Sequence, residues 1–483
     1  MMQLSEYAEH DGLGLAELVR RKEVTPTELV ATAQAAMATV DPALHAVVYD
    51  MRDAALESLQ GGLPDGPFTG VPLMLKDFVC QYAGVPTRFG SRLFEGLVPR
   101  QDNEIMARLR RAGFVTVAKT ACPEFGFNAA TEAIAYGAPT RNPWDVTRSP
   151  SGSSGGSAVA VAARMVPIAY GDDGGGSIRL PASHTATFGL KPTRGRVPLG
   201  PDLPDGAFGG LPCALGLTRS VRDCAALLDV MAGPDLGATY FAPPPLRSFL
   251  MEAGAPPGRL RIAFCASFSN DIAVDPECVA AVQHAAHLCE QLGHEVIETQ
   301  FEIDRLAFAR AWCTTFSAWL QPIVDGTAAQ LGRTPGLDNL ETATWSVVQY
   351  GRSLSASELV NAALFFNTLS REIARWFTAF DVLLTPTVSR PPSLLGVMNQ
   401  NEPGVDAYQF AANHLFSLGH VCAVFNATGQ PAMSVPLYWT LAGLPIGAHF
   451  VGPYGNEAML LRLAAQLETA QPWRRRLPPI CVG

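Results

Sequence analysis

Residues 149–182 read SPSGSSGGSAVAVAARMVPIAYGDDGGGSIRLPA, two glycine-rich runs separated by an apolar segment. The first run, 149–157, has the composition of a flexible linker. It continues without a break into the apolar residues 158–163, which suit a buried helix. A linker would not be expected to enter a core helix directly. We therefore predict a tight loop at the N-terminus of a helix.

The second run contains three consecutive glycines, Gly174, Gly175 and Gly176, followed by Ser177. Glycine allows the backbone to approach a ligand with no side chain in the way. The exposed N–H groups can then hold a phosphate or a developing oxyanion. The Gly-Lys-Ser/Thr ending of a phosphate-binding loop is missing here. An oxyanion hole beside a nucleophilic serine is therefore favoured over a phosphate site.

A serine nucleophile needs a base, because its hydroxyl reacts weakly at neutral pH. The GxSxG elbow of the α/β-hydrolases is missing, so a neutral lysine is considered in place of histidine. Lys76 follows the largely apolar run 70–75, although a lone lysine also suits the surface. Neutrality at pH 7 requires its pKa to fall by about 3 units, roughly 4 kcal/mol. Burial can supply that amount.

The whole chain has 483 residues, of which 48% are hydrophobic and 16% charged, with a net charge of −9. An average soluble chain has about 25% charged residues. This composition predicts a thick apolar core, excludes general disorder and gives no basic surface for nucleic acid. The most apolar stretch, 158–170, is interrupted by Arg164 and Pro167, so we expect no membrane-spanning helix.

Ten cysteines lie between Cys80 and Cys481 without a CxxC pair, which is typical of buried thiols in a reducing compartment. The first residues have neither the basic flank nor the apolar core of a signal peptide. We therefore expect a cytoplasmic protein. His284 and His287 are three residues apart, but no HExxH motif occurs, so we expect no metal site.

Helical and strand patterns alternate along the chain, with a capping box at Thr25 and Glu28. The alternation predicts one large α/β domain, although the length suggests about three domains. The predicted helices cover 102–111, 276–292 and much of 300–375, and the predicted strands cover 114–118, 259–264, 295–297, 381–384, 432–437 and 446–451. Four parts of the domain are expected: a helical segment at 1–60, a core at 61–220, a mainly helical pocket region at 221–375 and a sheet-completing part at 376–483.

These motifs resemble those of the amidase signature family, over about residues 5–475. The separation of Ser153 and Ser177 by 24 residues matches the spacing of the family's two catalytic serines. The resemblance implies a single α/β domain whose central mixed sheet is covered on both faces by helices. It rests on GSSGGS at 152–157, DGGGSIRLPA at 173–182, GLKPTRGRV at 189–197, RNPW at 141–144, GQPA at 429–432, GLPIG at 443–447 and the element ending in Lys76 and Asp77.

The resemblance also implies a Ser–cis-Ser–Lys triad that hydrolyses an amide through an acyl-enzyme. Ser177 corresponds to the nucleophile, Ser153 to the bridging serine after a cis peptide bond, and Lys76 to the base. No metal or organic cofactor is implied, and the partners are a small amide and water. The expected oxyanion donors are the N–H groups of Gly174, Gly175, Gly176 and Ser177, and the expected supporting residues are Ser154, Asp173 and Arg179.

Several positions depart from the family pattern. Ser151 replaces a usual glycine, and Asp172 and Gly174 replace frequent threonines. These changes affect the expected shape of the substrate rather than the chemistry. Within the family the sequence is most similar to the 6-aminohexanoate cyclic-dimer hydrolases, which implies a small, apolar or cyclic amide. Four aromatic residues either line the pocket or pack in the core: Trp312, Phe316, Trp319 and Trp345.

Two other functions stay open. The chain could be the catalytic subunit of a tRNA-dependent amidotransferase, whose partner chains would bind the tRNA. It could also be a scaffold that kept the fold and lost the reaction, against which the intact Lys76, Ser153 and Ser177 argue. The sequence leaves a homodimer open.

Overall fold

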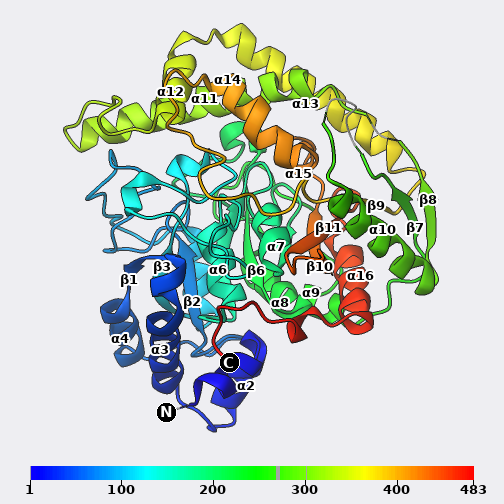
Figure 1. The fold of residues 1–483 in the computed structure, drawn as a ribbon. Coiled ribbons are helices and arrows are strands. Elements are labelled where there is room, and N and C mark those ends of the chain that lie inside the picture. The colour runs from blue at the N-terminus through cyan, green and yellow to red at the C-terminus, as the bar shows by residue number, and fades with distance from the viewer. Residues whose placement is uncertain (1, 268–271, 301) are drawn as a thin grey trace.

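The structure is a computed structural model that describes residues 2–267, 272–300 and 302–483 (Figure 1). Its centre is a mixed sheet of eleven strands in the order β1-β3-β2-β4-β6-β5-β10-β11-β9-β7-β8. The strands are β1 (Val47–Asp50), β2 (Pro72–Lys76), β3 (Val115–Thr120), β4 (Ile168–Asp173), β5 (Phe188–Lys191), β6 (Cys213–Thr218), β7 (Arg261–Phe264), β8 (Glu295–Glu298), β9 (Val382–Pro386), β10 (Ala432–Trp439) and β11 (Pro445–Val451).

The direction of the strands changes across the sheet. β2 runs parallel to β3 on one side and to β4 on the other. From β4 to β9 each strand is antiparallel to its neighbour, and β9, β7 and β8 are parallel again. Every residue of β2, β3, β4, β5, β6, β9 and β11 is buried. Strands without an exposed side have both faces of the sheet covered.

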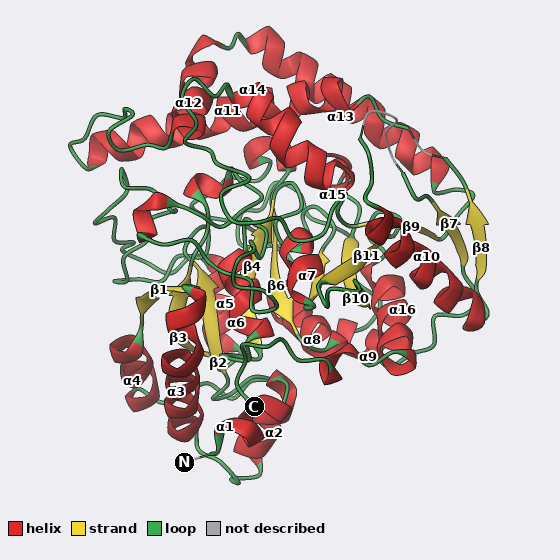
Figure 2. Cartoon of the chain, viewed as in Figure 1, coloured by secondary structure: helices red, strands yellow, loops and turns green. Residues whose placement is uncertain are grey.

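Helices provide that cover, as the red ribbons around the yellow sheet show in Figure 2. The α-helices are α1 (Leu4–Glu9), α2 (Gly12–Arg20), α3 (Pro26–Leu44), α4 (Arg52–Gln60), α5 (Glu104–Arg111), α6 (Gly155–Ala162), α7 (Arg179–Thr185), α8 (Val221–Met231), α9 (Phe249–Ala253), α10 (Pro276–Gln291), α11 (Arg305–Gln330), α12 (Thr342–Ser353), α13 (Ala356–Trp376), α14 (Ala407–Phe410), α15 (Phe416–Thr428) and α16 (Glu457–Ala470).

Local sequence signals explain where several helices begin. Thr25 and Glu28 form the predicted capping box, and Pro26 starts α3. Asp275 caps α10, and its first residue is also a proline. The apolar run after the first glycine-rich loop is α6, which begins at Gly155 and is buried throughout. The prediction of a loop that leads into a core helix is therefore confirmed.

Three long helices form an outer layer. α11 packs against both α12 and α13, and Figure 1 shows them as an arc at the top of the molecule, far from the N-terminal helices. α11 also contacts the short 3₁₀ turn Ala207–Gly210 and α15. Among the described residues, no helix is both long and apolar enough to cross a membrane.

The sequence analysis missed strands on the side of the sheet that carries the candidate site. β1 lies in the segment 1–60, which was expected to be helical, and its four residues are only partly buried. The strand character of β2 and β4 was also missed, because fully buried strands lack the alternation that identifies a strand in a sequence. The predicted strands at 114–118, 259–264, 295–297, 381–384, 432–437 and 446–451 are all present, with shifted ends.

Candidate active site

A cavity of about 240 Å³ opens beside the ends of β2 and β4. Lys76 is the last residue of β2 and Asp173 the last of β4. These two strands are parallel neighbours, so their carboxyl ends meet at the same edge of the sheet. Ser153 and Ser177, from the two glycine-rich loops, both line the cavity. The sheet thus brings together residues that are about a hundred positions apart.

Lys76 is fully buried and has two polar contacts. Its Nζ lies 2.7 Å from Ser153 Oγ and 2.5 Å from Asp172 Oδ1. The ammonium nitrogen also lies 5.0 Å from the centre of the Phe78 ring. The lysine is therefore held between one hydroxyl and one carboxylate, away from bulk water.

Ser153 follows a cis peptide bond from Gly152, as the resemblance implied. A Cβ at position 152 would lie 3.0 Å from the carbonyl oxygens of Asn128 and Ala130, so the backbone passes close to a neighbouring loop. The next residue, Ser154, connects the two glycine-rich loops. Its N–H donates to the Ser177 carbonyl at 3.1 Å, and its hydroxyl donates to the Asp172 carbonyl at 3.0 Å.

Ser177 stands at the end of the triple-glycine loop and is half-buried. Gly174 and Gly175 also line the cavity. Gly176 adopts φ of 124°, and a Cβ there would lie 2.9 Å from Cys422 Cβ, so only glycine fits without strain. The N–H of Gly176 donates to Asp173 Oδ1 at 2.7 Å, so this amide points into the protein.

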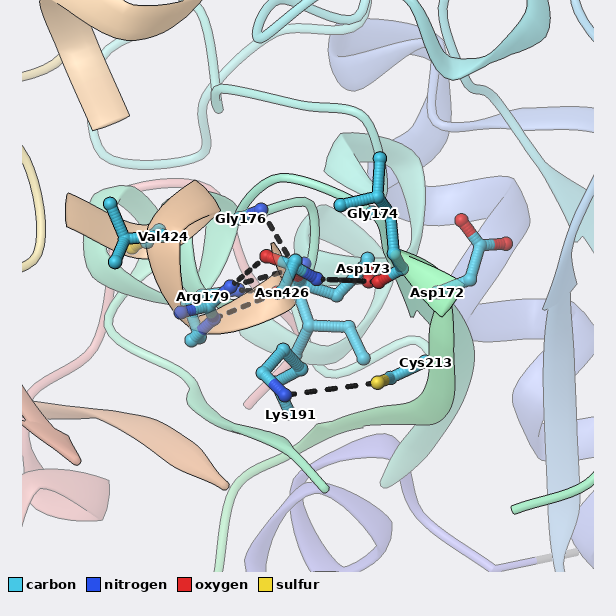
Figure 3. A network of polar contacts seen from close by, with 12 residues as sticks. Asp172, Asp173, Gly174, Gly176, Arg179, Lys191, Cys213, Val424 and Asn426 are labelled. Atoms are coloured by element: carbon cyan, nitrogen blue, oxygen red, sulfur yellow. Dashed lines mark hydrogen bonds and ion pairs between the residues drawn. The ribbon is translucent and has the colours of Figure 1, made fainter. Parts of the chain in front are cut away.

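Asp173 and Arg179 form a fully buried ion pair that fixes this loop (Figure 3). Arg179 Nε and Nη2 each lie 2.9 Å from a carboxylate oxygen of Asp173. The N–H of Ile178 donates to the same carboxylate at 3.1 Å. Burial alone would raise the pKa of Asp173, but the charge and hydrogen bonds of Arg179 outweigh it and hold the pKa far below its ordinary value.

Asn426 belongs to the same network, although the sequence gave no sign of it. Its Nδ2 donates to the Asp173 carbonyl at 2.6 Å and to Oδ1 at 3.0 Å, and its Oδ1 accepts from Arg179 Nη2 at 2.7 Å. The side chain comes from α15, about 250 positions later in the chain. Lys191, another buried lysine, donates to the Pro192 carbonyl and lies 3.7 Å from Cys213 Sγ.

Most of the cavity wall is apolar and aromatic. Trp312 and Phe316 line it, and their rings stack with centres 4.8 Å apart. Trp312 Nε1 also donates to the Gly174 carbonyl at 3.2 Å. Trp319 and Trp345 do not line the cavity: the former packs on Phe208 and the latter lies against Arg352. The aromatic wall also includes Phe78, Phe89, Phe94, Phe125, Phe208 and Phe416.

The histidines near these motifs have structural contacts. His184 Nε2 lies 3.2 Å from the Arg390 carbonyl, and burial lowers its pKa to about 4, so the ring is neutral at pH 7. His284 contacts Gln471, and His287 contacts the Gln283 carbonyl. Within residues 2–267, 272–300 and 302–483, no three His, Cys, Asp or Glu side chains gather as a metal site.

Comparison with known proteins gives consistent matches over nearly the whole chain. The family description "Amidase" matches residues 28–461. The 6-aminohexanoate-cyclic-dimer hydrolase of Paenarthrobacter ureafaciens is 37% identical over 480 residues, which cover 97% of this chain and 96% of that protein. The putative amidase AmiB2 of Mycobacterium tuberculosis strain H37Rv is 37% identical over 443 residues, 91% of this chain and 90% of that protein.

Solved structures agree with these matches. A 6-aminohexanoate cyclic dimer hydrolase superposes with a TM-score of 0.92 at 33% identity, covering 99% of this chain and 100% of the other. A bacterial aryl acylamidase of the amidase signature enzymes superposes with a TM-score of 0.86 at 25% identity, covering 96% and 97%. The chain therefore belongs to the amidase signature family, whose members hydrolyse carbon–nitrogen bonds, and it has that family's fold.

Proposed function

We propose that this protein hydrolyses the C–N bond of a small, apolar or cyclic carboxamide through an acyl-enzyme on Ser177. In this proposal Lys76 is the base and Ser153 relays the proton between Lys76 and Ser177. The observation that carries it is the 2.7 Å contact between Lys76 Nζ and Ser153 Oγ, at the wall of a cavity that Ser177 also lines. A buried lysine in contact with a serine hydroxyl is the arrangement that a serine nucleophile without histidine requires.

The reaction proceeds in two halves. Ser177 Oγ attacks the amide carbonyl carbon while its proton passes to Ser153, whose own proton passes to Lys76. The relay then returns a proton to the leaving nitrogen, since an amine must be protonated before the C–N bond breaks. Water enters by the same relay, attacks the ester carbonyl and releases the acid. The negative charge of each tetrahedral intermediate falls on the former carbonyl oxygen.

Backbone N–H groups of the triple-glycine loop would stabilise that oxygen. One such donor is worth about 3 kcal/mol of barrier. Four donors were expected, but the Gly176 N–H already donates to Asp173. We therefore assign the oxyanion to the N–H groups of Gly174, Gly175 and Ser177, and we give Gly176 the task of anchoring the loop. Ser154 and Arg179 would support the site through the contacts described above.

The lining of the cavity favours neutral substrates. Its charged members are two carboxylates, Asp172 and Asp202, and no Lys or Arg is among the described lining residues. A substrate with its own carboxylate would meet repulsion there without a compensating cation. The aromatic wall supplies apolar contact instead. A relative whose structure is described as complexed with substrate is a 6-aminohexanoate cyclic dimer hydrolase, which supports a cyclic amide as one candidate.

The test is a hydrolysis screen of amides that share one medium-length acyl chain. One member is cyclic, one is linear and neutral, and one is linear with a terminal carboxylate. We expect turnover of the neutral members and at least about tenfold lower kcat/KM for the anionic one. Asp202→Asn should narrow that ratio, because it removes the exposed carboxylate at the cavity wall. A preference for the anionic amide would contradict the proposed substrate class.

The same screen separates the two alternatives. Turnover by the purified chain alone would contradict an obligate amidotransferase subunit, which needs its partner chains. A fluorophosphonate probe tests the scaffold, since it reacts with activated serine hydroxyls. Labelling that Ser177→Ala abolishes would contradict a scaffold without a working site.

A further inference from the structure

Two neighbouring carboxylates at the end of β4 have opposite surroundings. Figure 3 shows the Asp172 carboxylate pointing away from the cluster around Asp173, as expected for successive residues of a strand. Asp173 accepts hydrogen bonds from Arg179, Asn426 and the loop N–H groups. Among the described residues, the carboxylate of Asp172 contacts only Lys76.

The second oxygen of Asp172 is therefore unusual. Asp172 Oδ2 is buried and has no hydrogen-bond partner in the described part of the chain, and the residue lines the cavity. A buried carboxylate with one hydrogen bond is poorly stabilised as an anion. Burial raises the pKa of Asp172, the Lys76 charge offsets part of that rise, and the nearby Asp173 charge adds to it. The side chain is thus suited to hold a proton.

Lys76 lies between the relay serine and this carboxylate. Its Nζ is 2.7 Å from Ser153 Oγ on one side and 2.5 Å from Asp172 Oδ1 on the other. An ammonium group can accept no proton unless it loses one. In contact with Asp172, it can release one proton to the carboxylate while it takes another from the serine. No exchange with bulk water is then needed.

We propose that Asp172 is the terminal proton acceptor of the relay and that Lys76 passes protons between Ser153 and Asp172. This inference rests on the proposed function. In the acylation step the Ser177 proton moves to Ser153, the Ser153 proton to Lys76 Nζ, and a Lys76 proton to Asp172 Oδ1. The Ser177 Oγ–carbon bond forms, and the carbonyl π electrons move onto the oxyanion. The reverse transfers deliver the proton to the leaving nitrogen.

Other titratable groups surround the pair. Asp173 and Tyr170 share β4 with Asp172, and the Tyr170 hydroxyl has a pKa raised by burial, so it stays neutral at pH 7. Cys80 and Cys122 are buried thiols whose pKa values are raised in the same way. On β2 and β3, Asp77 and Lys119 pair with each other at 3.3 Å. Of these groups, Asp173 is the uncompensated neighbour least, because Arg179 neutralises it.

The proposal makes a signed prediction for the pH profile. The wild-type pair is active with one shared proton, so activity persists below pH 7. In Asp172→Asn and Asp172→Thr, Lys76 must first lose its proton to water. The acid limb of kcat/KM should then move up by at least about one pH unit. If Asp172 only held Lys76 as an inactive ammonium, both variants would move the acid limb down.

The rate of fluorophosphonate labelling of Ser177 against pH is measured beside the hydrolysis profile. It reports activation of the serine without a known amide, so it separates this inference from the proposed function. Asp229→Asn is the charge control: it removes a partly buried carboxylate that caps α9, outside the cavity, and should leave the profile unchanged. An acid limb that stays or moves down in both Asp172 variants overturns the proposal. If neither variant folds, a wild-type acid limb above about pH 8 overturns it as well.

Discussion

Replacing Arg179 by methionine should destabilise the fold and disorder the oxyanion loop together. The substitution removes two charge-assisted hydrogen bonds to Asp173 and one to Asn426, all inside the protein. Removing one partner of a buried pair costs about 3–5 kcal/mol. Asp173 would keep its bonds from Gly176, Ile178 and Asn426, so we expect the lower end, about 3 kcal/mol at pH 7.

The pH dependence of that loss has a definite sign. The folded-state pKa of Asp173 lies below the ordinary value of 3.8, so the pair contributes its full stability above that pH. The contribution disappears as the pH falls through the folded-state pKa. The difference in free energy of unfolding between wild type and Arg179→Met should therefore be complete at pH 7 and should shrink below about pH 3.

Urea unfolding at several pH values measures the stability change, and steady-state kinetics measures the second effect. The Gly176 and Ile178 amides depend on Asp173, so a shifted loop should lower kcat by about 100-fold. Arg196→Met is the matched control, because Arg196 forms an equally buried two-bond pair with Glu457 away from the cavity. It should lose similar stability and keep kcat. An Arg179→Met protein with wild-type stability, or an equal loss at every pH, would refute the reasoning.

Three further results are expected. Trp312→Ala removes a ring of the cavity wall and its bond to the Gly174 carbonyl, so KM for apolar amides should rise by about tenfold in steady-state kinetics; an unchanged KM would remove Trp312 from the substrate site. Burial, and then the Glu341 charge, raises the pKa of Glu124 from 4.5 to about 8, so stability should fall as pH rises between these values. Glu124→Gln should abolish that fall in urea unfolding at about pH 5.5 and about pH 8, and a fall that persists in the variant would assign it to other groups. Nine cysteines are buried and Cys481 is half-exposed, so a thiol reagent should titrate about one thiol rapidly in the native protein; several fast thiols would contradict the described packing.

The motifs predicted the chemistry better than the sheet that positions it. Ser153 and Ser177 were identified because their glycine-rich loops have a local composition that the chemistry requires. The strand that ends in Lys76 was missed, since a fully buried strand shows no alternation. The helix α10 was predicted within one residue of its observed end, because its proline start and apolar stripe are local signals.

Contacts between distant residues lay beyond the sequence. Asn426 reaches Asp173 from α15, and nothing in its own neighbourhood marks it. Asp172 was noticed only as a departure from a pattern and was expected to affect the shape of the substrate. Its position against Lys76 depends on the parallel pairing of β2 with β4, which the sequence analysis did not predict. Of the four aromatic residues considered for the pocket, only the two on the inner face of α11 line it.

The covalent intermediate on Ser177 is the central claim. Intact-protein mass spectrometry after rapid acid quenching, with a slowly hydrolysed neutral amide, measures it directly. We predict a mass increase equal to the acyl group, located on the peptide that contains Ser177 and missing in Ser177→Ala. Turnover with no adduct in the wild type, or an adduct of the same mass that persists in Ser177→Ala, would contradict the account.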